Sequence, residues 1–361
     1  MQNPVAAVTS ADPYEFYAAL AREPRLVWRE GMWIAASPAL VMEVMTHAAC
    51  RVRPLAEPVP AAITGGSAGD VFAALVRMNE GERHASPKIA LQRALGSVPL
   101  EQVRAVASRI ARELAGATPM TAPRVSQWMM EVPVRTVASL LGFDDAQLPA
   151  LAWWLGRFVA CLSPLSSAAQ IAAAHGASLE LLGAFRALLQ SPRAGSLLEA
   201  VVHEAEEAGW DNDHAILANL VGLLSQTYEA TAGLIGNTVV ALQRGASWPA
   251  NAASLVRDVA RMDPPVQNTR RFVAEDAGIG GVRVQKGQVI LLVLAAASRD
   301  PRAEGRVFGF GHGPHACPGQ AMAEAIASAA IEALQDGLPR MQWRYRASVN
   351  ARIPEFFEEV E

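Results

Sequence analysis

The sequence predicts a mainly α-helical fold with a minor β part. Apolar residues recur with helical spacing through most of residues 100–245. Val103, Ala107 and Ile110, at i, i+4 and i+7, are one example. Residues 213–242 contain no proline and are apolar on most faces, which indicates a buried central helix about 45 Å long. The β-like segments are few, short and bounded by turn residues.

The N-terminal part begins with two expected short strands, over 26–28 and 32–34, and a helix that opens at Pro38. Prolines and the Gly65-Gly66 pair interrupt any period over 53–78. We therefore expect a long loop there with at most short helices, a kind of segment that often lines a ligand site.

The rest of the chain divides at clear turn signals. These lie at Gly142, Ser163-Pro164, Ser191-Pro192 and Gly209. After the central helix, β-like segments are expected around 271–273 and over 289–294. A glycine-rich loop over 308–319 and an alanine-rich helix over 320–334 complete the predicted order.

Length and composition favour residues 1–361 as one domain, and we expect a monomer. About half of the 361 residues are hydrophobic and 18% are charged, which is enough for a large interior. The net charge of -4 comes without a basic stripe, so nucleic-acid binding is not expected. The N-terminus lacks a cationic segment followed by an apolar run, and no stretch is apolar enough to span a bilayer. These features predict a cytoplasmic protein without membrane contact.

The three cysteines do not suggest a disulfide framework, because Cys50, Cys161 and Cys317 are scattered and odd in number. Cys317 lies in the loop FGFGHGPHACPG, directly before a predicted helix. Free amides and the dipole at a helix N-terminus lower the pKa of a thiol. One alternative is an incidental core cysteine in a glycine-rich turn. Another is a zinc site with His312 and His315, for which no second ligand cluster is evident.

The cysteine loop matches the haem-ligand signature of cytochromes P450, F-x-x-G-x-x-x-C-x-G, at Phe310, Gly313, Cys317 and Gly319. Residues 13–355 as a whole resemble soluble bacterial members of that family. The resemblance implies the cytochrome P450 fold, with haem b between the long central helix and the cysteine loop. It also implies that Cys317 ligates the iron, because a thiolate ligand favours O–O bond cleavage.

The resemblance also assigns contacts to the haem propionates. His84 and Lys88 lie one helical turn apart and could face one carboxylate, with Lys88 in place of the usual arginine. A solvated charged turn is the alternative for this segment. Arg271 is the expected arginine contact, with Arg270 as its competitor, and His315 stands at a further basic position.

Asp258 and Arg261 occupy the place of the family's E-x-x-R motif, which supports the cysteine loop. The acid is shortened here, and an exposed surface ion pair is the alternative. In the family a second arginine comes from a long meander, which is much shorter in this chain. Arg302 and Arg306 are the expected replacements.

The central helix resembles the family's oxygen-activating segment, A-G-x-(D/E)-T-T. Glu229 matches the acid, whereas Ala230 stands at the threonine position and Thr231 lies about 100° further around the helix. Gln226 and Thr227 replace the usual small residues. Three accounts stay open: a substrate hydroxyl or water completes the proton relay, Gln226 or Glu229 donates directly, or peroxide bypasses the relay. Polar residues that merely satisfy one another are the structural alternative.

The resemblance places the substrate between the loop over 54–72, the central helix and the C-terminal segment. The expected contacts are Leu223, Val266, Gln267, Asn268 and Asn350. Trp153, Trp154 and Phe158 are either part of the roof or core. No cluster of cations in the sequence marks a strongly acidic substrate.

The implied function is a haem-thiolate monooxygenase that hydroxylates or epoxidises a small, mostly apolar metabolite in specialised metabolism. Electrons would come from a separate ferredoxin or flavodoxin and its reductase, because no flavin or iron–sulfur module is evident. Glu324 lies near where relatives often carry an arginine, which argues against ordinary docking. One alternative is a catalyst that uses peroxide or needs no oxygen. The other is a non-catalytic haem-binding or ligand-binding protein.

Overall fold

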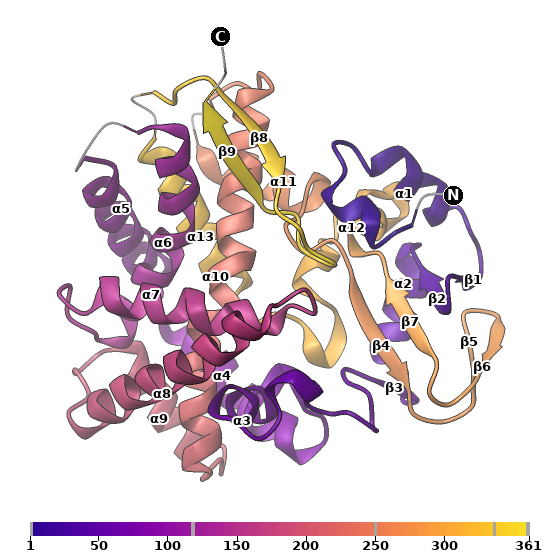
Figure 1. Cartoon of the computed structure of the whole chain (residues 1–361), viewed down its shortest axis with the longest axis horizontal. Helices are drawn as coiled ribbons and strands as arrows, with labels where there is room; N and C mark the ends of the chain where they lie inside the picture. Colours follow the sequence, from indigo (N-terminus) through magenta and orange to yellow (C-terminus); the bar gives the residue numbers. More distant parts are fainter. Residues whose placement is uncertain (1–2, 117–119, 249–250, 335–336, 359–361) are drawn as a thin grey trace.

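The computed structural model describes residues 3–116, 120–248, 251–334 and 337–358. A large helical part lies beside a smaller part that holds most of the strands and the N-terminal helices (Figure 1). The helices of the described residues are α1 Tyr14–Ala21, α2 Pro38–Thr46, α3 Ser67–Ala74, α4 Glu82–Ser97, α5 Leu100–Gly116, α6 Ala122–Leu141, α7 Leu148–Val159, α8 Ala168–Gln190, α9 Leu197–Glu207, α10 Asp213–Gln243, α11 Ala252–Met262, α12 Leu294–Arg299 and α13 Gln320–Glu332. The predicted mainly α fold with a minor β part is confirmed.

The smaller part is built on a five-stranded sheet with the order β1-β2-β7-β4-β3. Its strands are β1 Val27–Arg29, β2 Met32–Ala35, β3 Cys50–Arg51, β4 Thr269–Val273 and β7 Val289–Leu292. β2 runs parallel to β7, with Trp33 opposite Ile290, and the other neighbours are antiparallel. The sheet therefore joins the N-terminal segment to strands far along the chain.

The strand expected over 289–294 is two residues too long, because α12 begins at Leu294. The sequence that follows, Ala-Ala-Ala-Ser, favours a helix over a strand. Two hairpins escaped prediction, β5 Ala277–Ile279 with β6 Val282–Val284 and β8 Met341–Tyr345 with β9 Pro354–Glu358. β6 and β8 do alternate apolar and polar residues, but over only three and five residues, which is too short to stand out in the sequence.

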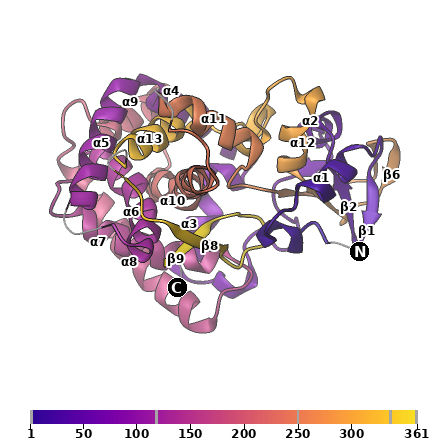
Figure 2. The ribbon, with the colours of Figure 1, turned by 90° about the horizontal axis from the view of Figure 1, so that it is seen from above.

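Helix α10 is the centre of the helical part, as predicted. Figure 2 shows it nearly end-on, surrounded by other helices. It packs on α6, α13 and α3, and it is mostly buried over 217–225 and over 231–240. The side chain of Asn212 caps its start by accepting from the Ala215 amide at 2.8 Å.

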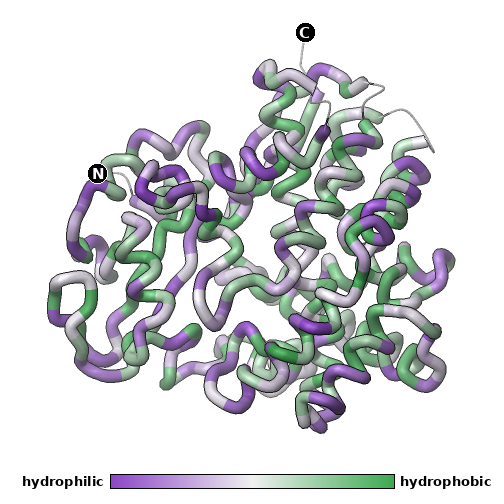
Figure 3. The backbone as a smooth tube through the Cα atoms, turned by 180° about the vertical axis from the view of Figure 1, so that it is seen from behind, coloured by the Kyte–Doolittle hydropathy of each residue, from purple (hydrophilic) through white to green (hydrophobic). Residues whose placement is uncertain are grey.

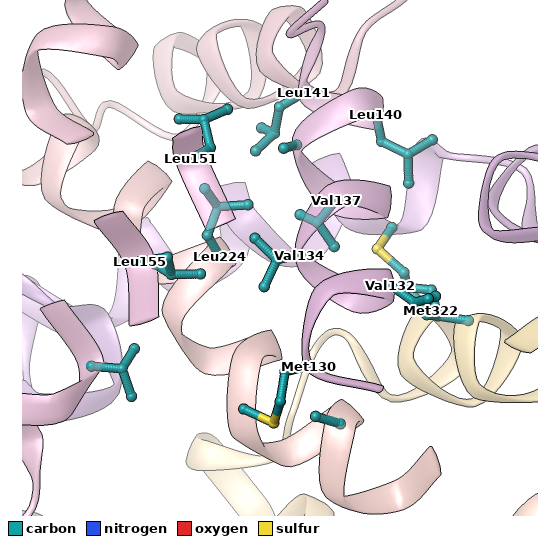
Figure 4. Close-up of a cluster of buried hydrophobic side chains, with 14 of the residues drawn as sticks. Met130, Val132, Val134, Val137, Leu140, Leu141, Leu151, Leu155, Leu224 and Met322 are labelled. Atoms are coloured by element: carbon teal, nitrogen blue, oxygen red, sulfur yellow. The ribbon is translucent and has the colours of Figure 1, made fainter. Parts of the chain in front are cut away.

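The core of the helical part lies where α6, α7 and α10 meet. Val134 and Val137 of α6, Leu151 and Leu155 of α7 and Leu224 of α10 point toward one another (Figure 4). All five are at most 2% exposed. Each such side chain contributes about 1.5–3 kcal/mol by leaving water. Hydrophilic residues lie mainly at turns and on outer helices (Figure 3). The contacts of α10 with its neighbouring helices in this core are therefore mainly apolar.

The expected loop over 53–78 contains α3 and two short 3-10 helices, Ala61–Ile63 and Val76–Met78. Asn219 of α10 binds this segment. Its side chain accepts a hydrogen bond from the Val76 amide and donates one to the Ala74 carbonyl, both at 2.9 Å. The loop is thereby pinned to the centre of the molecule.

Among the helices of the described residues, none has the length and apolar character needed to cross a membrane.

Candidate functional site

The cysteine loop is held in shape by backbone contacts. The Cys317 amide donates to the Phe310 carbonyl at 2.6 Å. Gly311 has φ +78°, and a Cβ there would lie 2.8 Å from the His315 carbonyl oxygen, so only glycine fits. The Phe308 amide donates to Ser298 Oγ of α12 at 2.9 Å, which ties the start of the loop to the sheet side.

The Cys317 side chain is exposed, whereas Cys50 and Cys161 are buried. Burial nevertheless raises the pKa of the Cys317 thiol, against a lowering by a hydrogen bond from Gly319 and by Lys88. The expected net lowering of its pKa is wrong for this structure, because desolvation outweighs the helix N-terminus. A cationic metal at the sulfur would reverse that balance.

Next to the thiol lies a group of basic side chains, the basic cluster, formed by His84, Lys88, Arg271 and His315. The two imidazole rings stack with centroids 4.2 Å apart. Lys88 donates to the Ala316 carbonyl, and burial lowers its pKa. The pKa of His315 falls to about 3, first by burial and then through His84, Arg271 and Lys88.

The basic cluster has unneutralised positive charge. Arg271 is only 6% exposed, and burial lowers its pKa. Neither it nor Lys88 takes part in an ion pair within the part of the chain that the structure describes. Among the described residues, Arg271 Nη1 donates only to the neighbouring Arg270 carbonyl, at 3.0 Å. A buried guanidinium without an ion pair fits an anionic ligand group, and haem brings two carboxylates.

In the middle of α10, Gln226 and Glu229 are exposed and the residues between them are half-buried, whereas the helix is mostly buried before and after this stretch. Gln226 Nε2 donates to the Gly222 carbonyl at 3.0 Å, and Thr227 Oγ1 donates to the Leu223 carbonyl at 2.8 Å. Both side chains therefore bond back along their own helix. Leu223 itself is half-buried beside them.

Unlike Gln226 and Thr227, the Glu229 side chain makes no hydrogen bond to the backbone of its own helix among the described residues. Burial raises its pKa, while Arg346 and Arg77 lower it. Ala230 follows without a hydroxyl, and Thr231 is only 2% exposed. Glu229 is thus the ionisable group that α10 offers to the interior. Arg77 and Arg346 were missed in the sequence, since each lies on an element far from Glu229.

The expected brace is not formed as predicted. Asp258 is exposed, and neither it nor Arg261 has an ion pair in the described ranges. Arg302 pairs with Asp300 at 2.6 Å, and Arg306 pairs with its neighbour Glu304. Because both arginines find acids in the short segment itself, neither replaces the missing meander arginine.

Arg299, rather than Asp258 or Arg261, connects α11 to the segment that holds the cysteine loop. Its Nη1 donates to the Met262 carbonyl at the end of α11, and its guanidinium stacks over the Tyr14 ring at 3.8 Å. Arg299 ends α12, the helix whose Ser298 holds the start of the cysteine loop. The link between α11 and the loop therefore runs through α12.

A buried ion pair stands beside this link. Arg352 is 0% exposed, and its Nε lies 2.9 Å from Asp263 Oδ1. Its remaining donors bind the carbonyls of Val8, Ser10 and Ala11, and the Tyr14 hydroxyl donates to Asp263. The pair joins the N-terminal segment to the C-terminal hairpin and to the end of α11.

The expected substrate contacts after α11 lie together but are largely occupied. Gln267 and Asn268 are at most 1% exposed. Their amides donate to the carbonyls of Pro264 and Val349 at 2.6 and 3.0 Å. The Gln267 amide N–H donates to the Asn350 carbonyl at 2.8 Å. The side-chain oxygens of Gln267 and Asn268 are buried without a partner in the described chain.

The other expected pocket residues have varied surroundings. Val266 is half-buried and pairs with Ala351 in an isolated bridge, and the Asn350 side chain is exposed. Phe158 is completely buried in the core, whereas Trp153 is 63% exposed with Arg157 over its ring.

No family model matches the chain. Curated relatives do. The chain is 30% identical over 244 residues to "Putative cytochrome P450 133B2" of Xylella fastidiosa, which covers 60% of each chain. It is 26% identical over 285 residues to "Mycinamicin IV hydroxylase/epoxidase" of Micromonospora griseorubida, covering 70% of this chain and 71% of that one. The matches thus span about 60% of the length of the first of these relatives.

Solved structures are similar over nearly the whole chain. Epothilone B-bound cytochrome P450epoK superposes with a TM-score of 0.83 at 18% identity, covering 99% of this chain and 98% of that one. CalO2 superposes with a TM-score of 0.78 at 21% identity, covering 98% and 96%. These solved structures share the fold of the chain, and the first of the curated relatives is named a cytochrome P450. The chain therefore has the cytochrome P450 fold and is similar in sequence to bacterial proteins of that family.

Proposed function

We propose that the chain is a haem-thiolate monooxygenase that hydroxylates or epoxidises a small, mostly apolar metabolite. The observation that carries this proposal is Cys317, whose side chain is exposed in the cysteine loop beside the basic cluster. The curated relative "Mycinamicin IV hydroxylase/epoxidase" supports the reaction class. We further propose that residues 1–361 act as one domain.

Haem b is the cofactor of this family. In the proposal, Cys317 ligates the iron, and His84, Lys88, Arg271 and His315 bind the propionates. Phe310 and Gly319 would flank the ring through the cysteine loop. Bound haem would supply the activation of dioxygen. The unneutralised charge of the basic cluster supports this assignment.

Glu229 is the proposed proton carrier of the chain. Its pKa is raised by burial, so it can hold a proton at a pH where an ordinary glutamate has lost it. Gln226 donates to its own helix and is less suited to that role. With Ala230 at the usual threonine position, water or a substrate hydroxyl would have to connect Glu229 to the reacting centre.

The carbon monoxide complex of the reduced protein tests the thiolate. We expect its Soret band at about 450 nm, as thiolate ligation implies. Cys317→Ser should abolish that band, whereas Cys161→Ser, a change at a buried cysteine of the core, should retain it. A band that survives Cys317→Ser would disprove the assignment.

Ala230 favours a second candidate, a haem-thiolate catalyst that uses peroxide, because the usual relay hydroxyl is missing. Turnover with hydrogen peroxide is to be compared with turnover using a ferredoxin, its reductase and NAD(P)H. Product formed only with the electron donors supports the monooxygenase, and product formed only with peroxide supports the alternative. Consumption of neither oxidant would indicate a non-catalytic binding protein.

The electron donor is proposed to be a separate ferredoxin or flavodoxin. Its contact face would include the surface near Cys317, where Glu324 bonds with Gln320 on α13. The monomeric state and the cytoplasmic location stay predictions.

A further inference from the structure

The two ends of helix α3 are held in different ways. At its C-terminal end, Asn79 donates from Nδ2 to the carbonyls of Ala73 and Leu75 at 2.9 and 2.8 Å. Asn219 of α10 adds its bonds to the residues on either side of Leu75. Asn79 and Asn219 are 4% and 1% exposed. This end is therefore fixed by buried side chains that each make several hydrogen bonds.

The N-terminal end of α3 contacts α8 around one histidine. Ser67 Oγ donates to the His175 carbonyl at 2.7 Å and lies 2.6 Å from Ser178 Oγ. The Ala68 amide donates to Nδ1 of the His175 ring at 3.3 Å. A Cβ at Gly66 would lie 2.2 Å from that ring, so the imidazole fills the space that the glycine leaves. His175 is only half-buried, in contrast to the two asparagines.

The fixed end of α3 lies against the candidate site. A Cβ at Gly222 of α10 would come within 2.8 Å of Leu75 Cδ2 and within 3.2 Å of Gln226 Nε2. Leu75 therefore packs close to Gln226 in the middle of α10. Helix α3 packs on both α8 and α10 (Figure 1), so it connects the His175 contact to the site.

The bond to the histidine ring depends on the charge of that ring. A neutral imidazole can accept a hydrogen bond at Nδ1, whereas a protonated imidazole carries a donor on both nitrogens. A protonated ring would also place a positive charge against the N-terminal end of α3, where free amides form the positive end of the helix dipole. Protonation of His175 therefore removes one contact and adds a repulsion.

The ionisable neighbours of His175 are few. On α8 itself, Glu180 and Arg186 lie five or more residues away in the sequence. The helices that pack on α8 carry these ionisable side chains: Asp70 of α3, Arg157 of α7, and Asp213, His214 and Glu229 of α10. Among the described residues, none of them makes an ion pair or a hydrogen bond with His175. A charge on the ring would therefore act mainly on the N-terminal end of α3.

We propose that the contact of His175 with Gly66, Ser67 and Ala68, the α3 latch, is released by acid and controls access to the substrate site. With a neutral imidazole, α3 stays on α8 and covers the approach to Gln226. Protonation breaks the bond from Ala68 and loosens this end of α3, while the buried asparagines keep the other end in place. The control of access rests on the proposed function, whereas the latch itself does not.

Hydrogen exchange followed by mass spectrometry tests the latch in the whole chain, with or without haem. Each rate is divided by the intrinsic rate at the same pH, which gives a protection factor. Between about pH 8 and about pH 5, a range that spans the ordinary titration of histidine, the protection of α3 should fall about tenfold. The protection of the buried helix α13 should change much less. Equal changes in α3 and α13 would overturn the proposal.

Two variants test the imidazole directly. His175→Gln can accept the amide hydrogen bond without titrating, so α3 should keep its protection at both pH values. Gly66→Ala places a methyl group against the ring and should release α3 at both pH values. Its backbone tolerates alanine, because φ is −129°. A pH response of the wild-type size in His175→Gln would contradict the proposal.

Each test variant has a matched control that should behave as the wild type. His203→Gln changes an exposed histidine of α9. Gly176→Ala adds a Cβ on α8, directly beside His175, that meets nothing within 4 Å. Release of α3 by Gly176→Ala as large as that by Gly66→Ala would contradict the role of the ring.

Access to the site is tested with phenylimidazole, which binds ferric haem and shifts its Soret band. In stopped-flow measurements at about pH 8, association should be severalfold faster in Gly66→Ala than in Gly176→Ala. Equal rates, with the protection of α3 lost only in Gly66→Ala, would overturn the control of access. A chain that binds no haem would refute the proposed function, while acid release of α3 in hydrogen exchange would still support the latch.

Discussion

The cysteine side and the α10 side of the site are built in different ways. On the cysteine side, one contiguous loop carries Cys317 and His315, and glycines and short backbone hydrogen bonds determine its shape. On the α10 side, Arg77 and Arg346, which lie on elements far apart in the sequence, act electrostatically on Glu229. The comparison teaches that a local motif can carry a candidate cofactor ligand, while the charge around Glu229 depends on how distant segments pack.

The largest expected effect concerns the buried pair that supports the cysteine side. Arg352→Met should cost about 3 kcal/mol of unfolding free energy, because it removes the buried arginine that pairs with the half-buried Asp263 and that binds the carbonyls of the N-terminal segment. Urea unfolding followed by circular dichroism measures this. The control Arg344→Met breaks an exposed pair and should cost about 1 kcal/mol or less. Equal costs for the two variants would show that the cysteine side does not depend on this pair.

A second prediction separates the two adjacent arginines of β4. Arg271→Gln should weaken haem binding about tenfold or more, because the buried Arg271 of the basic cluster is the proposed partner of a haem propionate. Arg270→Gln should have a much smaller effect. Transfer of haem to an excess of apomyoglobin measures the rate of loss. Faster loss from the Arg270 variant would reverse the assignment.

A third prediction concerns the missing hydroxyl on the α10 side. Ala230→Thr should raise the product formed per dioxygen consumed severalfold if Glu229 needs a neighbouring hydroxyl to pass its proton. Thr231→Val should leave this ratio nearly unchanged, since Thr231 is buried away from the interior space. An unchanged ratio in Ala230→Thr would mean that water or substrate already completes the relay.

The smallest expected effect is a pH dependence of stability in the haem-free protein. Because burial raises the pKa of Glu229, the folded chain keeps a proton that the unfolded chain loses. Stability should therefore decline as the pH rises from about 4.3, the ordinary glutamate value, through the raised pKa. Glu229→Gln should abolish this decline in thermal melts, whereas Glu275→Gln, a change at an exposed turn, should not. If the wild type and Glu229→Gln showed the same dependence of melting temperature on pH, the prediction would be contradicted.

Strong periodicity and strong turn residues made some elements predictable. Helix α10 and the strands around Glu30 follow from such patterns. The hairpin of β8 and β9 did not, because its short strands are stabilised by pairing with each other and by the packing of β9 on α6 and α10. The brace was predicted at Asp258 and Arg261, whereas the structure places contacts at Arg299 and Asp263. Spacing alone could not show which acid would be buried.

The sequence by itself determined the family resemblance, the thiolate candidate Cys317 and the central position of α10. These depend on neighbouring residues, whose geometry follows from local backbone rules. Only the tertiary structure decided the charge around Glu229. The sequence shows no cluster of cations, yet in the folded chain both Arg77 and Arg346 act electrostatically on the same carboxylate. Electrostatic interactions depend on distance and burial in three dimensions, and neither can be read from separation along the chain.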